Sequence, residues 1–172
     1  LSFSFDEKYL VSRGGAEDNY LIVWYVETGK AICGNTAGTD YVHQVKFFNK
    51  TNEKIITCQN YGIRIWKVDY KAKKFTYIDV NVGNLKRQIL CICVDPYDKF
   101  AYCGTKSGDI LEIDLVNGIY KRIGPVKRLF PQGVNCIKML PNSDLLVGTK
   151  DGLIAKVNFT SFRVKCESKV LG

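Results

Sequence analysis

The side chains able to do chemistry are few in this chain and lie far apart in the sequence. His43 is the only histidine. A single histidine leaves few routes to a general base, so we expect His43 to be a surface or structural residue. The adjacent carboxylates Asp6-Glu7 and Glu17-Asp18 stand at predicted turns, where such residues are common. The motifs of nucleotide-binding loops and serine hydrolases (GxxxxGKS/T, GxGxxG and GxSxG) are absent from the sequence.

The cysteines do not form the pattern of a metal centre or of a catalytic site. Their odd number excludes a fully paired disulfide framework, no CxxC pair occurs, and one histidine cannot complete a Cys/His zinc set. We therefore expect buried free thiols in a reducing compartment. We expect no enzyme activity, no cofactor, no metal and no small-molecule substrate. The seven cysteines are Cys33, Cys58, Cys91, Cys93, Cys103, Cys136 and Cys166.

The charge balance is basic, with 25 Lys and Arg residues against 17 Asp and Glu residues and a net charge of +8. Such a balance favours acidic partners, which include nucleic acid, an anionic membrane and an acidic protein surface. The cations are dispersed in short groups such as Lys86-Arg87 and Lys127-Arg128, each of which alone is typical of a solvated loop. No stretch approaches the roughly 20 apolar residues of a membrane span, so we expect no membrane partner.

An internal repeat organises the apolar residues. Four times, a short apolar run is followed by a turn rich in Asp, Asn or Pro and by a second apolar run, which is the pattern of a β-hairpin. Equivalent residues of the hairpins recur at spacings of 43, 46 and 46, namely Phe5, Phe48, Val94 and Leu140. A third apolar run follows each hairpin, with equivalents at spacings of 42, 47 and 44, namely Trp24, Trp66, Ile113 and Val157.

A weaker fourth run closes each unit, so the period of about 42 to 47 residues contains four predicted strands and no amphipathic helix. This is the length and strand number of a WD40 blade. We predict an all-β chain of about four four-stranded blades, forming one WD40 β-propeller segment over residues 1–172. The blades are predicted at about residues 1–34, 41–80, 88–123 and 133–170.

The WD signature itself is degenerate in this chain. Only Asp114 retains the Asp of the WD dipeptide, and no Gly-His precedes a first strand. We therefore expect no hydrogen-bonded Asp-His-Ser-Trp tetrad, and we expect Trp24 and Trp66 to pack between blades. Four blades make a poor closed ring, and an open arc exposes two apolar faces. We expect a piece of a longer protein, in which these blades belong to a seven-bladed propeller or a propeller pair.

Several segments, in order along nearly the full chain, carry a resemblance to a known family. They include Ile22-Val23-Trp24, Ala31-Ile32-Cys33-Gly34, Ile63-Arg64-Ile65-Trp66, Leu85-Lys86-Arg87, Gly124-Pro125 and Leu145-Leu146-Val147-Gly148-Thr149. In these segments the chain resembles the axonemal WD-repeat family of cilia- and flagella-associated protein 52. The resemblance implies two tandem propellers, no catalytic residues, and a protein bound inside doublet microtubules of cilia or flagella beside tubulin and other axonemal proteins.

A non-catalytic scaffold of the axoneme is thus the leading hypothesis, and a basic face would suit acidic tubulin. Loops that join a fourth strand to the next blade all emerge on one face of a propeller. We therefore expect Lys86, Arg87, Lys127 and Arg128 to form a protein-binding patch there. Two alternatives stay open: a cytoplasmic adaptor that reads a short peptide at the propeller mouth, and an RNA-binding propeller with Tyr41 or Phe130 available for stacking.

Overall fold

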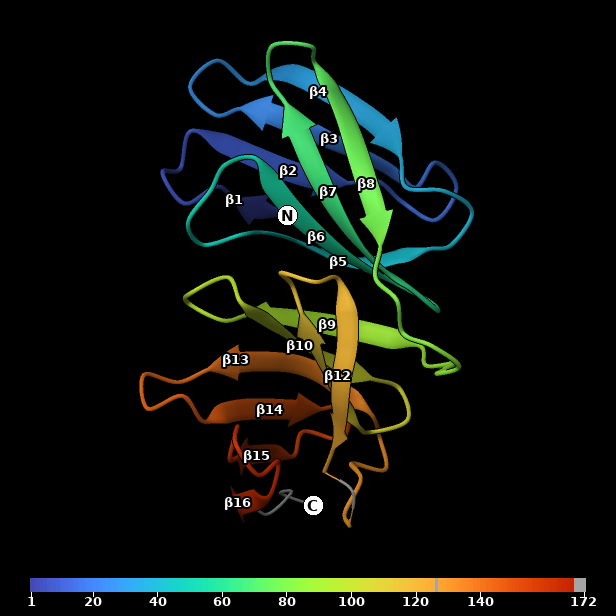
Figure 1. Ribbon diagram of the computed structural model, residues 1–172, viewed down its shortest axis with the longest axis vertical. Helices are drawn as coiled ribbons and strands as arrows, with labels where there is room; N and C mark the ends of the chain where they lie inside the picture. The colour runs from blue at the N-terminus through green and yellow to red at the C-terminus, as the bar shows by residue number, and fades with distance from the viewer. Residues whose placement is uncertain (126, 169–172) are drawn as a thin grey trace.

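The computed structural model describes residues 1–125 and 127–168, and these residues form sixteen strands in four antiparallel sheets of four strands each (Figure 1). The first sheet contains β1 (Ser2–Phe3), β2 (Tyr9–Arg13), β3 (Tyr20–Tyr25) and β4 (Lys30–Thr36). The second contains β5 (Val42–Phe47), β6 (Lys54–Gln59), β7 (Ile63–Asp69) and β8 (Lys74–Asp79). The third contains β9 (Ile89–Val94), β10 (Phe100–Thr105), β11 (Ile110–Asp114) and β12 (Ile119–Gly124). The fourth contains β13 (Val134–Met139), β14 (Leu145–Thr149), β15 (Ile154–Val157) and β16 (Val164–Glu167).

Each sheet is built from four strands that are consecutive in the chain and paired in chain order. This arrangement confirms the predicted all-β fold with four-stranded blades. The four sheets follow one another along the long axis of the molecule, from the N-terminal sheet to the C-terminal one (Figure 1). The described residues contain no helix, and hence none that is long and apolar enough to cross a membrane.

The strand registers agree from blade to blade. Trp24 lies opposite Leu10, Trp66 opposite Ile55, Ile113 opposite Ala101 and Val157 opposite Leu145. The repeat therefore holds at the level of single residues. Side chains alternate between the two faces of a strand, so each sheet offers one apolar set to the preceding sheet and another to the following sheet.

Three apolar layers fill the spaces between adjacent sheets. On β6, Ile55 packs in the layer shared with the first sheet, whereas its neighbours Ile56 and Cys58 pack in the layer shared with the third sheet. The layer between the third and fourth sheets contains Tyr102 of β10 and Val147 of β14. Burial of these layers is the main favourable contribution to folding, because every layer removes two apolar faces from water.

The two tryptophans occupy equivalent positions but have different surroundings. Trp66 has no exposed surface, and it packs in the layer between the first two sheets while its indole N–H donates to the Thr57 hydroxyl at 2.9 Å. The Trp24 indole donates to Ser12 at 2.8 Å, but this side chain is only half-buried, on the face of the first sheet that points away from the second. The expected packing between blades is confirmed for Trp66. Trp24 instead lines a hollow with Phe3 and Leu10, since no described sheet covers that face.

The turns between second and third strands hold the linkers that join the blades. Asn19 donates through its side-chain amide to the carbonyls of Gly38 and Asp40, at 2.9 and 2.6 Å. Asp109, which is 2% exposed, accepts from the Thr105 hydroxyl and from Arg87 of the preceding linker. These polar contacts orient successive sheets where the apolar layers end.

Loss of the Trp66 side chain should destabilise the first blade interface. We expect Trp66→Ala to lower the free energy of unfolding of the intact protein by about 3–5 kcal/mol, because it empties a fully buried site. Trp66→Phe keeps an aromatic ring but leaves the Thr57 hydroxyl unpaired, and should cost about 1–3 kcal/mol. Urea unfolding followed by circular dichroism measures both values. Equal losses for the two variants would contradict the proposed role of the indole in packing.

Two equivalent glycines provide a matched test of the linker contacts. Gly108 and Gly152 stand in the same turn of the third and fourth blades with positive φ values of 87° and 82°. A Cβ on Gly108 would lie 1.9 Å from the Phe130 carbonyl oxygen, whereas a Cβ on Gly152 meets nothing within 4 Å. We expect Gly108→Ala to cost about 1–3 kcal/mol more than Gly152→Ala, because only the first overpacks the linker. Thermal melts of both variants compare the two positions, and similar melting temperatures would contradict the expectation.

Candidate protein-binding surface

Three buried cysteines lie in surroundings that disfavour nucleophilic chemistry. Burial raises the pKa of the Cys91 thiol to about 12, and it also raises the pKa values of Cys58 and Cys103. A thiol with a raised pKa holds little of the reactive thiolate. The expectation of buried thiols is wrong for Cys136 and Cys166, which are exposed. Both belong to the fourth sheet, which is the last sheet that the structure describes, so no further described sheet covers them.

His43 is the second residue of β5 and has a structural role there. Its Nε2 lies 2.8 Å from Oδ1 of Asn60, and its ring meets Tyr41 edge-on at 5.1 Å. No Asp-His-Ser-Trp tetrad is formed by the described residues, although the pairs Trp24–Ser12 and Trp66–Thr57 remain as parts of one. Within residues 1–125 and 127–168, no three His, Cys, Asp or Glu side chains converge as a metal site would require.

The two residues of the first predicted basic pair, Lys86 and Arg87, have different roles. Lys86 is exposed, and none of the ion pairs among the described residues includes it. Arg87 is half-buried, and its Nε lies 2.9 Å from the Oδ2 atom of buried Asp109. Arg87 therefore neutralises an internal carboxylate and fastens the linker to the third blade.

The second predicted pair lies in the linker between β12 and β13. Lys127 is exposed and has no carboxylate partner among the described residues. Arg128 is paired with Glu167 of β16, with 2.6 Å between its Nη2 and the carboxylate Oε2. Two of the four predicted cations thus hold internal ion pairs, and the common patch of all four stays a prediction.

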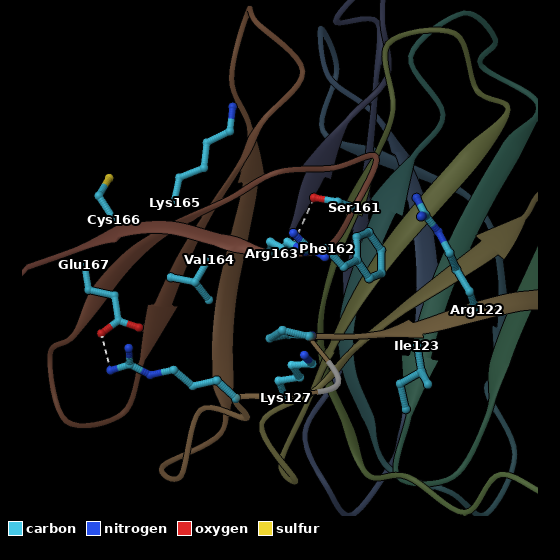
Figure 2. A pocket seen from close by; sticks show the side chains of 12 residues that line it. Arg122, Ile123, Lys127, Ser161, Phe162, Arg163, Val164, Lys165, Cys166 and Glu167 are labelled. Atoms are coloured by element: carbon cyan, nitrogen blue, oxygen red, sulfur yellow. Dashed lines mark hydrogen bonds and ion pairs between the residues drawn. The ribbon is translucent and has the colours of Figure 1, made fainter.

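Lys127 and Arg128 border a groove between the outermost strands of the third and fourth blades (Figure 2). Figure 2 shows Lys127 between two walls, with Arg122 and Ile123 on one side and the labelled residues of β16 on the other. The groove has a volume of about 720 Å³. Its cations are Arg122, Lys127, Arg128, Arg163 and Lys165, and its apolar residues are Ile123, Pro125, Phe162 and Val164.

A buried carboxylate positions one wall of the groove. Glu112 of β11 is 2% exposed and forms ion pairs with Arg122 and with Lys121, the latter at 3.3 Å. The Arg122 guanidinium also donates to the carbonyls of Phe159 and Thr160 and lies 4.3 Å from the centre of the Phe162 ring. Arg122 therefore joins the third blade to the loop before β16, and its charge is already compensated.

The spacing of residues in the sequence did not reveal the groove. Lys127-Arg128 was found as an adjacent pair, whereas Arg163 and Glu167 come from the next blade and are isolated in sequence. The nearest indication of this site in the sequence was the weak fourth apolar run of the fourth blade. That run forms an edge strand, so its residues are available for contact with a partner. Sequence reasoning thus found one side of this site and missed the other.

Of the two aromatic residues considered for RNA stacking, Phe130 is buried and cannot stack on a base. Phe130 is 1% exposed, so its ring is closed to a nucleobase. Tyr41 is half-buried, with His43 at one edge and the Arg13 guanidinium 4.5 Å from its ring centre. The suggestion of Phe130 as a stacking residue is therefore wrong, and Tyr41 has a ring face already covered by a cation.

Relatives of known name match most of the chain, although no protein-family model matches it. Cilia- and flagella-associated protein 52 of Chlamydomonas reinhardtii is 41% identical over 152 residues, which cover 88% of this chain and 25% of that protein. The human protein of the same name is 36% identical over 157 residues, which cover 90% and 25%. The chain therefore spans about a quarter of the length of these curated relatives.

A solved structure supports the fold independently. The β-propeller domain of Cps50 (Swd1) from Myceliophteria thermophila matches with a TM-score of 0.79 over 97% of this chain and 57% of that one. Its sequence identity of 14% is too low to carry more than the fold. The chain thus has the WD40 β-propeller fold and is a relative of cilia- and flagella-associated protein 52 along nearly all of its own length.

Proposed function

We propose that this protein is a non-catalytic scaffold of cilia or flagella, with tubulin and other axonemal proteins as its partners. The observation that carries the proposal is the 41% identity to cilia- and flagella-associated protein 52 over 88% of the chain. The names of the relatives support a place in the cilium or flagellum. Burial raises the pKa values of Cys58, Cys91 and Cys103, which disfavours these three thiols as nucleophiles.

Charge supports an acidic protein partner. The chain carries a net charge of +8, and a basic surface attracts and orients an acidic one during association. Lys86 and Lys127 are exposed and have no carboxylate partner among the described residues, so contact with a partner breaks no internal ion pair. The microtubule wall inside cilia is the acidic surface that the family resemblance indicates.

The groove between the third and fourth blades favours a second candidate, an adaptor that binds a peptide. Its apolar residues and cations lie together at a strand edge, as in sites that accept extended segments. A peptide adaptor and a microtubule scaffold share Lys127, which lines the groove, whereas Lys86 lies outside the groove and belongs only to the microtubule proposal.

Charge reversal at the two unpaired lysines tests the microtubule proposal. We expect the intact protein carrying Lys86→Glu and Lys127→Glu to show an apparent Kd for microtubules about tenfold higher in co-sedimentation, equivalent to about 1.4 kcal/mol. The effect should shrink as salt is added, because exposed charges are screened. Arg87 is left unchanged, since a reversal there would place a second carboxylate beside buried Asp109.

The matched control reverses Lys71 and Lys74, which are exposed on the turn before β8 and at its first residue. This control changes the net charge equally but leaves the linkers intact, so it should bind like the unaltered protein. Unchanged binding of the Lys86 and Lys127 variant would contradict the proposed contact. Equal losses in both variants would indicate a response to total charge without a defined surface.

A further inference from the structure

We propose that the groove between β12 and β16 binds an extended segment of a partner protein in which acidic and apolar residues alternate. The segment would pair with the free edge of β16 and place its carboxylates beside Lys127 and Arg163. This inference rests on the proposed scaffold function and adds the kind of segment that is bound. The unpaired cations, the strand edge and the apolar lining of the groove each support it.

The charges of the groove leave two cations without an internal partner. Arg122 is compensated by Glu112, Arg128 by Glu167, and Lys165 by Asp144 at 2.8 Å. Lys127 and Arg163 are exposed, and no ion pair among the described residues includes either of them. Both line the same groove, so an anionic ligand there would gain two charge-assisted contacts.

The backbone of β16 forms one wall of the groove. β16 is the last strand of its sheet and, within residues 1–125 and 127–168, is paired only with β15. All four residues of β16 line the groove, so both faces of the strand and hence its edge border it. An edge strand presents unpaired N–H and C=O groups, to which an extended peptide adds as a further strand.

Glu167 holds one cation of the groove in place. Its Oε2 lies 2.6 Å from Nη2 of Arg128, and its Oε1 is buried and has no hydrogen-bond partner among the described residues. Because Oε1 is buried, a bound segment would not reach it. Glu167 therefore serves the groove by holding Arg128, and the contacts to a segment come from the other lining residues.

The apolar lining distinguishes a peptide from a nucleic acid. Ile123, Pro125 and Val164 line the groove, and they match apolar side chains on one face of an extended segment. Phe162 is the aromatic residue that lines the groove, and it is 4% exposed with Arg122 over its ring. Because its ring has no open face, base stacking is disfavoured in the groove, and acidic side chains on a strand fit it better.

A synthetic ten-residue peptide of alternating Glu and Val, labelled with fluorescein, is the probe for this groove. We expect saturable binding to the intact protein in fluorescence anisotropy, and a Kd at least tenfold higher for the variant carrying Lys127→Glu and Arg163→Glu. The control variant with Lys71→Glu and Lys74→Glu should bind like the unaltered protein. A control peptide of the same length with alternating Lys and Val should not bind. Thermal melts check that both variants remain folded.

Backbone pairing is tested on the unaltered protein, so it does not depend on the folding of any variant. Two further probes are N-methylated at every Val or at every Glu, which removes the N–H groups from one side of the strand or from the other. Pairing with a single edge predicts that one probe loses binding and the other keeps it. Equal binding of both, or binding of an oligouridylate as tight as that of the peptide, would overturn the proposal.

The two proposals fail separately. If the protein binds microtubules but not the acidic peptide, only the proposal of an acidic segment in the groove is overturned. If it binds the peptide but not microtubules, only the proposal of a microtubule partner is overturned.

Discussion

Each sheet of this protein has two apolar faces, and the need to cover both governs the rest of the structure. A four-stranded sheet of this size cannot bury either face by itself, so neighbouring sheets stack and share their layers. Trp66 shows the result at one interface, where it has no exposed surface, while the equivalent Trp24 is half-buried on a face without a described neighbour. The same side chain is therefore core or surface according to the sheet beside it.

Stacking also explains where the polar contacts and the groove lie. First strands of adjacent blades, such as β9 and β13, pack against one another, and the outermost strands β4 and β8 are also in contact. Between β12 and β16 a groove remains, and beside it Arg122 joins the two blades by donating to the carbonyls of Phe159 and Thr160, while its ion pair with Glu112 lies within the third blade. A buried carboxylate needs a cation, so the main role of Arg122 is to neutralise Glu112. In the groove, Arg122 forms part of one wall.

The ion pairs divide the basic residues into two groups. Arg87, Arg122 and Arg128 hold carboxylates of this chain, whereas Lys86, Lys127 and Arg163 remain available to a partner. A count of basic residues does not separate these two groups. Arginine supplies the cation in four of the eight ion pairs among the described residues, and lysine supplies it in the other four.

The sequence by itself determined the sheets and their register, because strand formation follows local alternation and turn chemistry, and four copies of one pattern reinforce each other. The equivalence of Trp24, Trp66, Ile113 and Val157 could be read directly from their spacing. Only the tertiary structure decided that Arg87 meets Asp109, that Phe130 is buried, and that Arg163 lines the same groove as Lys127. Those contacts join side chains from different strands or blades, and their geometry depends on how the sheets stack, which local spacing does not encode.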